Sequence, residues 1–261
     1  MFKKLSIFLS IFLLFLAAAT FPITYAVVDA NGYLWITKNH FCNNQHAWQF
    51  TNLQAGYVTI GREAELYYNQ RGTNTIAKMN RAGDRVTYVG NVTGTVRDIC
   101  YHGQKLQVLS SDGLFSYDNG NFVKIFSSGE YIAMASRTHA LNKCWLIKSD
   151  GTVYGYLQGG FLSEAVPGGG YDIAVGQYDN LYAVGTGGDA YCVYVWDDEG
   201  EDWYPMHYMN GNRFDTWEVY GGVTSDCPGD HCIQKVDNPL FSGTICDLDF
   251  PNSGGAWFCD A

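Results

Sequence analysis

The chain has 261 residues, a formal net charge of −10 and 47% hydrophobic residues. This length suits a single domain that buries a sizeable core. The acidic balance argues against nucleic acid and anionic lipid as partners, because proteins that bind them carry basic patches.

The first 26 residues have the features of a secretory signal peptide. Two lysines supply the charged start, residues 5–19 form an apolar run, and residues 24–26 offer a small-residue cleavage site. The apolar run is short for a membrane span, which needs about 20 residues. We expect cleavage after Ala26, which leaves residues 27–261 as one secreted, extracellular domain with no membrane insertion.

An apolar residue followed in most copies by an aromatic one recurs along the rest of the chain. The copies are Leu34 and Trp35, Leu66 and Tyr67, Leu106 and Gln107, Cys144 and Trp145, Leu181 and Tyr182, Val219 and Tyr220, and Ala256 and Trp257. Their second residues lie 32, 40, 38, 37, 38 and 37 positions apart. A period near 38 with four strand-sized runs fits a β-propeller blade and is too long for a leucine-rich repeat.

Most copies follow a strand-like run that contains isoleucine, at Ile60, Ile99, Ile132, Ile173 and Ile245. Turn sequences rich in Gly, Asn and Asp separate the runs, and no capped amphipathic segment indicates a helix. The sequence therefore predicts an all-β fold with five full blades, which begin near Ile60, Ile99, Ile132, Ile173 and Phe214, and a sixth built from both chain ends. The shorter first spacing favours six blades, because it places Trp35 on a different strand from the other copies. Seven blades remain the alternative if that copy is equivalent to the rest.

Eight cysteines follow the signal segment, and an even number in an oxidising compartment indicates disulfides. Cys227 and Cys232 bracket a tight turn and are expected to pair with each other. Cys100 and Cys144 occupy similar positions in successive repeats, which makes a bridge between blades a second hypothesis. A bridge among Cys42, Cys246 and Cys259 would tie the two chain ends together, and the sequence does not fix the connectivity.

Residues 165–203 resemble the tectonin repeat. The match rests on Val166, Pro167 and Gly168, on the run Asp-Ile-Ala-Val-Gly at 172–176, on Leu-Tyr-Ala-Val at 181–184, on Tyr-Val-Trp at 194–196 and on Trp203. Weaker copies start at Tyr57, Arg97, Tyr131 and Ile245, while Gln107 and residues 210–237 depart from the pattern. The resemblance implies a six-bladed propeller of the tectonin, tachylectin and fish egg lectin kind that binds sugars on microbial or other cell surfaces.

Aromatic side chains in the repeated positions are the candidate sugar contacts, because Tyr and Trp combine an apolar face with a hydrogen-bonding end. They are Trp35, Trp145, Tyr182, Trp196, Trp203 and Trp257. Packing between sheets is the competing interpretation of each. Several weak sites on one ring would gain avidity through multivalency.

Other motifs give weaker evidence of function. The acidic run at 197–202 is expected to be a solvated turn rather than a calcium site, and the Gly-rich run at 185–190 a hairpin turn rather than a phosphate loop. His231 and His207 do not indicate zinc beside cysteines that are expected to be oxidised. Asn91 begins the chain's N-glycosylation sequon, Asn-Val-Thr.

These observations favour a lectin over two alternatives. The first alternative is an extracellular structural or matrix protein that binds protein partners or its own copies. The second is a hydrolase with Asp98, Asp172 and Asp247 at a central channel, but aspartates at such positions more often accept hydrogen bonds in turns. We expect a non-enzymatic glycan-binding protein without metal or cofactor.

Overall fold

The protein is described by a computed structural model that covers residues 25–28, 31–37, 49–61, 65–102, 105–136, 144–156, 159–175, 181–187, 190–205, 220–222 and 232–234. Within these ranges the chain forms strands, turns, bends and irregular segments, and no helix. The prediction of very low helix content is thus confirmed for the described residues. None of them belongs to a helix of the length and hydropathy needed to cross a membrane.

The strands follow one another closely along the chain. They are β1 (Tyr25–Val28), β2 (Tyr33–Thr37), β3 (Gln49–Ile60), β4 (Leu66–Gln70), β5 (Thr75–Met79), β6 (Val86–Asn91), β7 (Val96–His102), β8 (Lys105–Ser110), β9 (Gly113–Asp118), β10 (Asn121–Phe126), β11 (Tyr131–Ser136), β12 (Cys144–Lys148), β13 (Val153–Gly155), β14 (Gly160–Phe161), β15 (Asp172–Val175), β16 (Leu181–Gly187), β17 (Ala190–Asp197), β18 (Asp202–Pro205), β19 (Tyr220–Gly222) and β20 (Cys232–Gln234).

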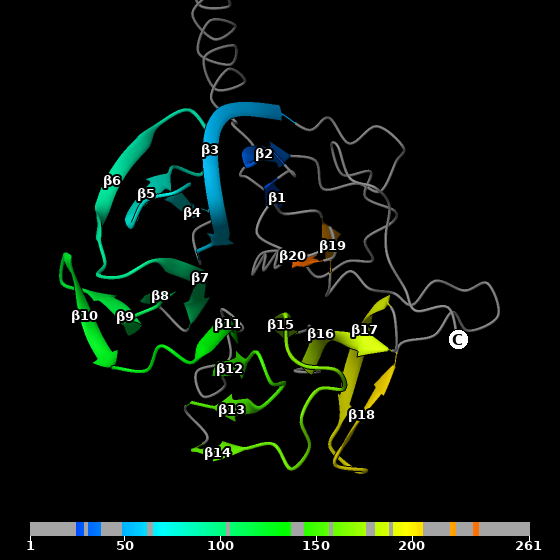
Figure 1. Ribbon diagram of the computed structural model, residues 1–261. Coiled ribbons are helices and arrows are strands. Elements are labelled where there is room, and N and C mark those ends of the chain that lie inside the picture. The colour runs from blue at the N-terminus through cyan, green and yellow to red at the C-terminus, as the bar shows by residue number, and fades with distance from the viewer. Residues whose placement is uncertain are drawn as a thin grey trace, which may run out of the picture.

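Four consecutive groups of four strands form antiparallel sheets, which we call blades: β3–β6, β7–β10, β11–β14 and β15–β18. The first strand of each blade contacts the first strand of the next, from β3 through β7 and β11 to β15. Figure 1 shows the blades arranged in succession around a common centre, with these first strands innermost. This arrangement is that of a β-propeller.

Four of the five predicted isoleucines lie on innermost strands, and Ile245 lies outside the described residues. Ile60, Ile99 and Ile173 are at most 1% exposed, and Ile132 is half-buried on β11. In the five copies that the structure describes, the apolar member of the repeated pair is buried as well, at Leu34, Leu66, Leu106, Cys144 and Leu181, while Val219 and Ala256 lie outside the described residues. The repeat is thus a burial pattern, because every blade must cover both of its faces with a neighbour.

Turn residues have the conformations that their sequences predict. Between β9 and β10, Asn119 and Gly120 have φ values of 48° and 87°. Two successive residues with positive φ are typical of the two-residue hairpin that matches strand twist. The Gly-rich run at 185–190 joins β16 to β17, whose residues Gly187 and Ala190 pair, so it is a hairpin and the prediction is confirmed.

The first sheet differs from the others because β3 serves two groups of strands. Its first half pairs with β2, while its second half pairs with β4 as the innermost strand of blade β3–β6. β1 begins at Tyr25, and Ala26 is 2% exposed within the core cluster of this region. The expected cleavage after Ala26 would therefore remove two residues from β1.

The hypothesis of a bridge between Cys100 and Cys144 is wrong. Both residues are buried thiols on neighbouring blades. The Cys144 thiol instead donates a hydrogen bond to the Gln107 side-chain oxygen, at 3.5 Å. Gln107 stands where most copies of the repeat have an aromatic residue. A buried amide needs a polar partner, and the Cys144 thiol supplies one. The expected pair of Cys227 and Cys232 involves residue 227, which lies outside the described residues.

Candidate ligand site

The sequence-predicted aromatic residues lie in the interior or at its border. Tyr182 and Trp203 are 8% and 4% exposed, and the Trp203 indole N–H donates to the Glu164 carbonyl at 3.2 Å. Trp35 is half-buried on β2, with its ring centroid 4.9 Å from that of Phe50. These contacts are those of packed side chains.

Trp145 and Trp196 are half-buried, and both pack against the core cluster that contains Trp203. The rings of Trp196 and Trp203 meet edge to face with centroids 5.3 Å apart. The Trp145 indole nitrogen is buried and has no hydrogen-bond partner among the described residues. The structure thus gathers three of the six predicted residues between blades β11–β14 and β15–β18, and Trp257 lies outside the described residues.

A second group of aromatic residues, which the sequence analysis missed, crosses blade β11–β14 from its innermost to its outermost strand. It consists of Tyr131 on β11, Tyr154 on β13 and Phe161 on β14. The ring centroids of Tyr131 and Tyr154 are 6.2 Å apart, and those of Tyr154 and Phe161 are 4.9 Å apart. With Glu130 and Lys148 they form what we call the Tyr131 cluster.

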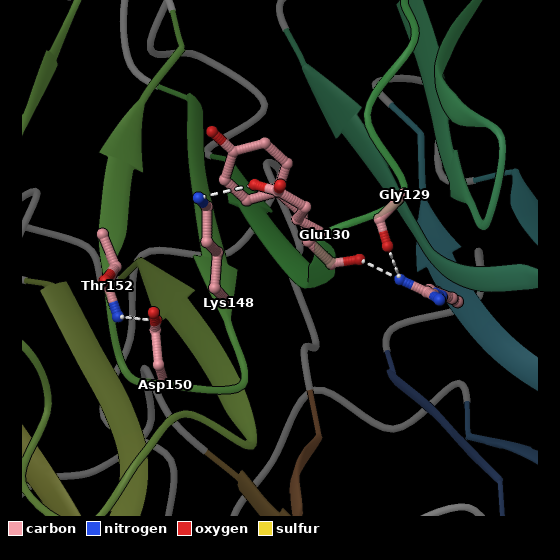
Figure 2. A network of polar contacts seen from close by, with 7 residues as sticks. Gly129, Glu130, Lys148, Asp150 and Thr152 are labelled. Atoms are coloured by element: carbon pink, nitrogen blue, oxygen red, sulfur yellow. Dashed lines mark hydrogen bonds and ion pairs between the residues drawn. The ribbon is translucent and has the colours of Figure 1, made fainter.

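Lys148 supplies the charge at the centre of this cluster. Its Nζ lies 2.6 Å from Glu130 Oε2, 5.6 Å from the Tyr131 ring centroid and 5.9 Å from that of Phe161. Figure 2 shows the ammonium group of Lys148 meeting the carboxylate of Glu130. The hydrogen bond to Glu130 raises the pKa of Lys148, and burial raises the pKa of the Tyr131 phenol. The raised pKa of Lys148 keeps its ammonium group charged at neutral pH, beside the aromatic rings of the cluster.

The backbone around the cluster is fixed by polar contacts. The Arg97 guanidinium, from blade β7–β10, donates to the carbonyls of Gly129 and Tyr131 at 2.5 and 2.8 Å. Asp150, in the turn after Lys148, accepts from the Thr152 N–H at 2.9 Å, which lowers the pKa of its carboxyl. These contacts fix the segment that carries Glu130 and the turn that follows Lys148 at the end of β12, so the cluster is preorganised.

The cluster is open at its outer end. The Phe161 side chain is 59% exposed, and that of Glu130 is 68% exposed. Lys148 is less accessible, with 24% of its side chain exposed. Parts of an aromatic ring, a carboxylate and an ammonium group are therefore accessible within one cluster.

A related group between blades β3–β6 and β7–β10 is closed by comparison. Tyr67 is 9% exposed, stacks on Tyr101 at 5.8 Å and donates its hydroxyl to Glu65 at 3.3 Å. Lys78 completes it, 3.4 Å from Glu65 and 5.5 Å from the Tyr67 ring centroid. Burial, followed by the charge of Glu65, raises the pKa of Tyr67 well above its usual range. Tyr67 and Glu65 of this group are thus largely enclosed, and its exposed member is Lys78, with 38% of its side chain exposed.

The aspartates considered for hydrolysis have structural partners where they are described. The Asp98 carboxylate accepts from the N–H groups of Ile99 and Met134, at 2.8 and 2.7 Å, and thereby links β7 to β11. Asp172 occupies the corresponding place on β15 and accepts from the Ile173 N–H at 2.8 Å. Asp247 lies outside the described residues.

The acidic run at 197–202 is the turn between β17 and β18, as predicted. Asp197 accepts from the Glu199 N–H at 3.0 Å, and Asp202 from the Trp203 N–H at 2.7 Å. Within the part of the chain that the structure describes, no group of three or more His, Cys, Asp and Glu residues is placed to hold a metal ion. His207 and His231 fall outside that part.

No family model matches this chain, and no curated protein matches it. Its fold is similar to those of many solved structures. One is a structural genomics protein of unknown function from Bacteroides thetaiotaomicron, with a TM-score of 0.52, 13% identity, and 70% of this chain and 58% of that one covered. Others are virginiamycin B lyase from Staphylococcus aureus and YCF48 bound to D1 peptide, each with a TM-score of 0.47 and 13% identity over 72% of this chain. The former match covers 71% of its target and the latter 67%. At these identities the likeness concerns the fold alone.

Proposed function

We propose that this protein is a secreted lectin that binds glycans on microbial or other cell surfaces, such as lipopolysaccharide. The observation that carries the proposal is the open Tyr131 cluster, where an exposed aromatic ring adjoins a lysine–glutamate pair. A pyranose ring offers an apolar C–H face and a border of hydroxyl groups, which suit these two elements. The resemblance of residues 165–203 to the tectonin repeat supports the same function independently.

In this proposal the sugar lies against Phe161, with Tyr154 behind it. The exposed Glu130 carboxylate accepts hydrogen bonds from sugar hydroxyls, and Lys148 donates to a ring or hydroxyl oxygen. Hydrogen bonds to charged groups contribute about 1.5–3 kcal/mol each, so a single site of this size gives modest affinity. A further site between blades β11–β14 and β15–β18, near Trp145 and Trp196, would raise the overall avidity.

The test is a glycan array probed with the oxidised, secreted protein and with three variants. Phe161→Ala removes the exposed ring and is expected to weaken binding at least tenfold, and Trp145→Ala tests the sequence-predicted site. Tyr204→Ala is the matched control, because Tyr204 is an aromatic residue on an outermost strand, 49% exposed, outside the cluster. A folded wild-type protein that binds no glycan would refute the proposal.

The second candidate function is a matrix protein that binds other proteins, and one observation favours it. Large apolar side chains are exposed at Phe50 on β3 and along the outermost strands, at Val86, Tyr88, Val123, Ile125, Phe161 and Tyr204. Exposed apolar surface is typical of protein contacts. Cross-linking in the native extracellular fluid distinguishes the two functions, because a matrix protein would yield a defined partner and no glycan binding.

We also propose that the ring has six blades and closes through the two chain ends. β1, β2 and the first half of β3 form three strands, and the run around Ile245 would supply a fourth. Such closure removes two exposed sheet edges. β20, which contacts β15, would then belong to the fifth blade, between blade β15–β18 and the blade built from the two chain ends. Deleting residues 244–261 should lower the melting temperature by several degrees, whereas an unchanged value would exclude this closure; seven blades remain the alternative.

We propose no enzymatic activity. Asp98 and Asp172 are engaged with backbone N–H groups, and a hydrolase needs two carboxyls with different pKa values facing its substrate. Measurable hydrolysis of a bound glycan, lost on Asp98→Asn with the fold intact, would refute this.

A further inference from the structure

The outermost strand of blade β3–β6 exposes large apolar side chains at a sheet edge. Val86 and Tyr88 on β6 are 44% and 64% exposed, and residues 86–91 carry no charge. β6 is the last strand of its sheet, so among the described strands none pairs with its outer side. Uncharged strands rich in β-branched and aromatic residues are templates for edge-to-edge association.

The other outermost strands each carry a feature that opposes such association. β10 has Lys124 among its exposed residues, and β14 is only two residues long. β18 begins with Asp202 and ends with Pro205. Natural sheets protect their edges by bulges, of which the β5–β6 pair has one, and by three further means, which are charge, shortness and proline. β6 has none of the three.

The strand register places Asn91 on the same face of the blade as the exposed residues. Met79 pairs with Val86, Ala77 with Tyr88, and Thr75 with Asn91. The three β5 residues alternate along their strand and therefore share one face, and their partners share it with them. A register shift between Ile76 and Ala77 accounts for the odd spacing from Tyr88 to Asn91.

Both ends of the sequon are accessible. Asn91 ends β6, and Asn91 and Thr93 are exposed, while Val92 between them is 3% exposed. Tyr88 lies three residues before Asn91, which is about 10 Å along a strand. A bulky, hydrated glycan on Asn91 would thus stand over the apolar residues of the same face.

We propose that an N-glycan on Asn91 protects the β6 edge and takes the place of the charge or proline that the other edges carry. The proposal rests on secretion through a eukaryotic route. It is independent of the ligand, because the Tyr131 cluster lies on a different blade. Without the glycan, β6 of one copy is expected to pair with an edge of another and produce oligomers.

The experiment compares proteins secreted from eukaryotic cells. Thr93→Ala removes the sequon but keeps Asn91, and an endoglycosidase that leaves one sugar removes the glycan from folded wild-type protein. Intact mass measures modification, and size-exclusion chromatography with light scattering measures association. The rescue variant is Thr93→Ala with Tyr88→Lys, and its matched control is Thr93→Ala with Val123→Lys on β10.

We expect a glycosylated, monomeric wild-type protein, and a several-fold larger oligomer fraction for both the Thr93→Ala variant and the trimmed protein. Tyr88→Lys should restore the monomer and Val123→Lys should not. A wild-type protein without the glycan, or a trimmed protein that stays monomeric, overturns the proposal. A glycan-array result of either kind leaves it unaffected, so its failure is distinguishable from failure of the lectin function.

Discussion

Replacing Asp98 should show how strongly the blades depend on contacts between their innermost strands. Asp98 is 5% exposed, and its carboxylate accepts from Ile99 in its own strand and from Met134 in the next blade. Asp98→Ala would leave both N–H groups buried without these acceptors. At about 1–3 kcal/mol for each unsatisfied group, the free energy of unfolding should fall by about 2–6 kcal/mol.

The assay is urea denaturation followed by tryptophan fluorescence. Asp98→Asn keeps one side-chain oxygen and should cost about half as much as Asp98→Ala. The matched control is Asp118→Ala in the same blade, because Asp118 is 45% exposed in a 3.3 Å ion pair with Lys105. Exposed ion pairs contribute about 0–1 kcal/mol. A loss for Asp98→Ala no larger than that of the control would refute the reasoning.

Three further measurements test the structure. Mass spectrometry of the secreted protein should find an N-terminus at or before Tyr25, because β1 includes Tyr25 and the buried Ala26; a start at Val27 would contradict this. Stability should fall above about pH 10, since the raised pKa of Tyr67 keeps its proton in the folded state while the unfolded chain loses it. The slope should be shallower by up to about 1.4 kcal/mol per pH unit in Tyr67→Phe, and an identical slope would argue against it. Cys100 and Cys144 should react with a thiol reagent only after unfolding, whereas rapid reaction of the native protein would mean that they are accessible.

Much of the fold could be predicted from local sequence. The isoleucines at 60, 99 and 173 mark buried innermost strands, and Asn119 with Gly120 marks a hairpin. Such features follow from side-chain alternation and from backbone conformations that few residues adopt. They can therefore be predicted without knowledge of contacts between distant parts of the chain.

The site could be predicted less well. Trp203 and Tyr182 were candidates because of their type and position, yet both are packed inside. The sequence does not separate the two roles, because an aromatic residue in a repeated position suits the core and a ligand site equally well. The Tyr131 cluster was missed because Tyr131, Lys148 and Phe161 belong to three different strands. Only the pairing of β11 to β14 brings them together.

By itself, the sequence determined the all-β class, the repeat of about 38 residues and the places of the turns, because these depend on neighbours along the chain. The tertiary structure alone decided that Cys100 and Cys144 stay thiols and that Asp98 joins two blades. It alone decided that Asn91 shares a face with Tyr88, since one register shift reverses the side on which a strand presents every following residue.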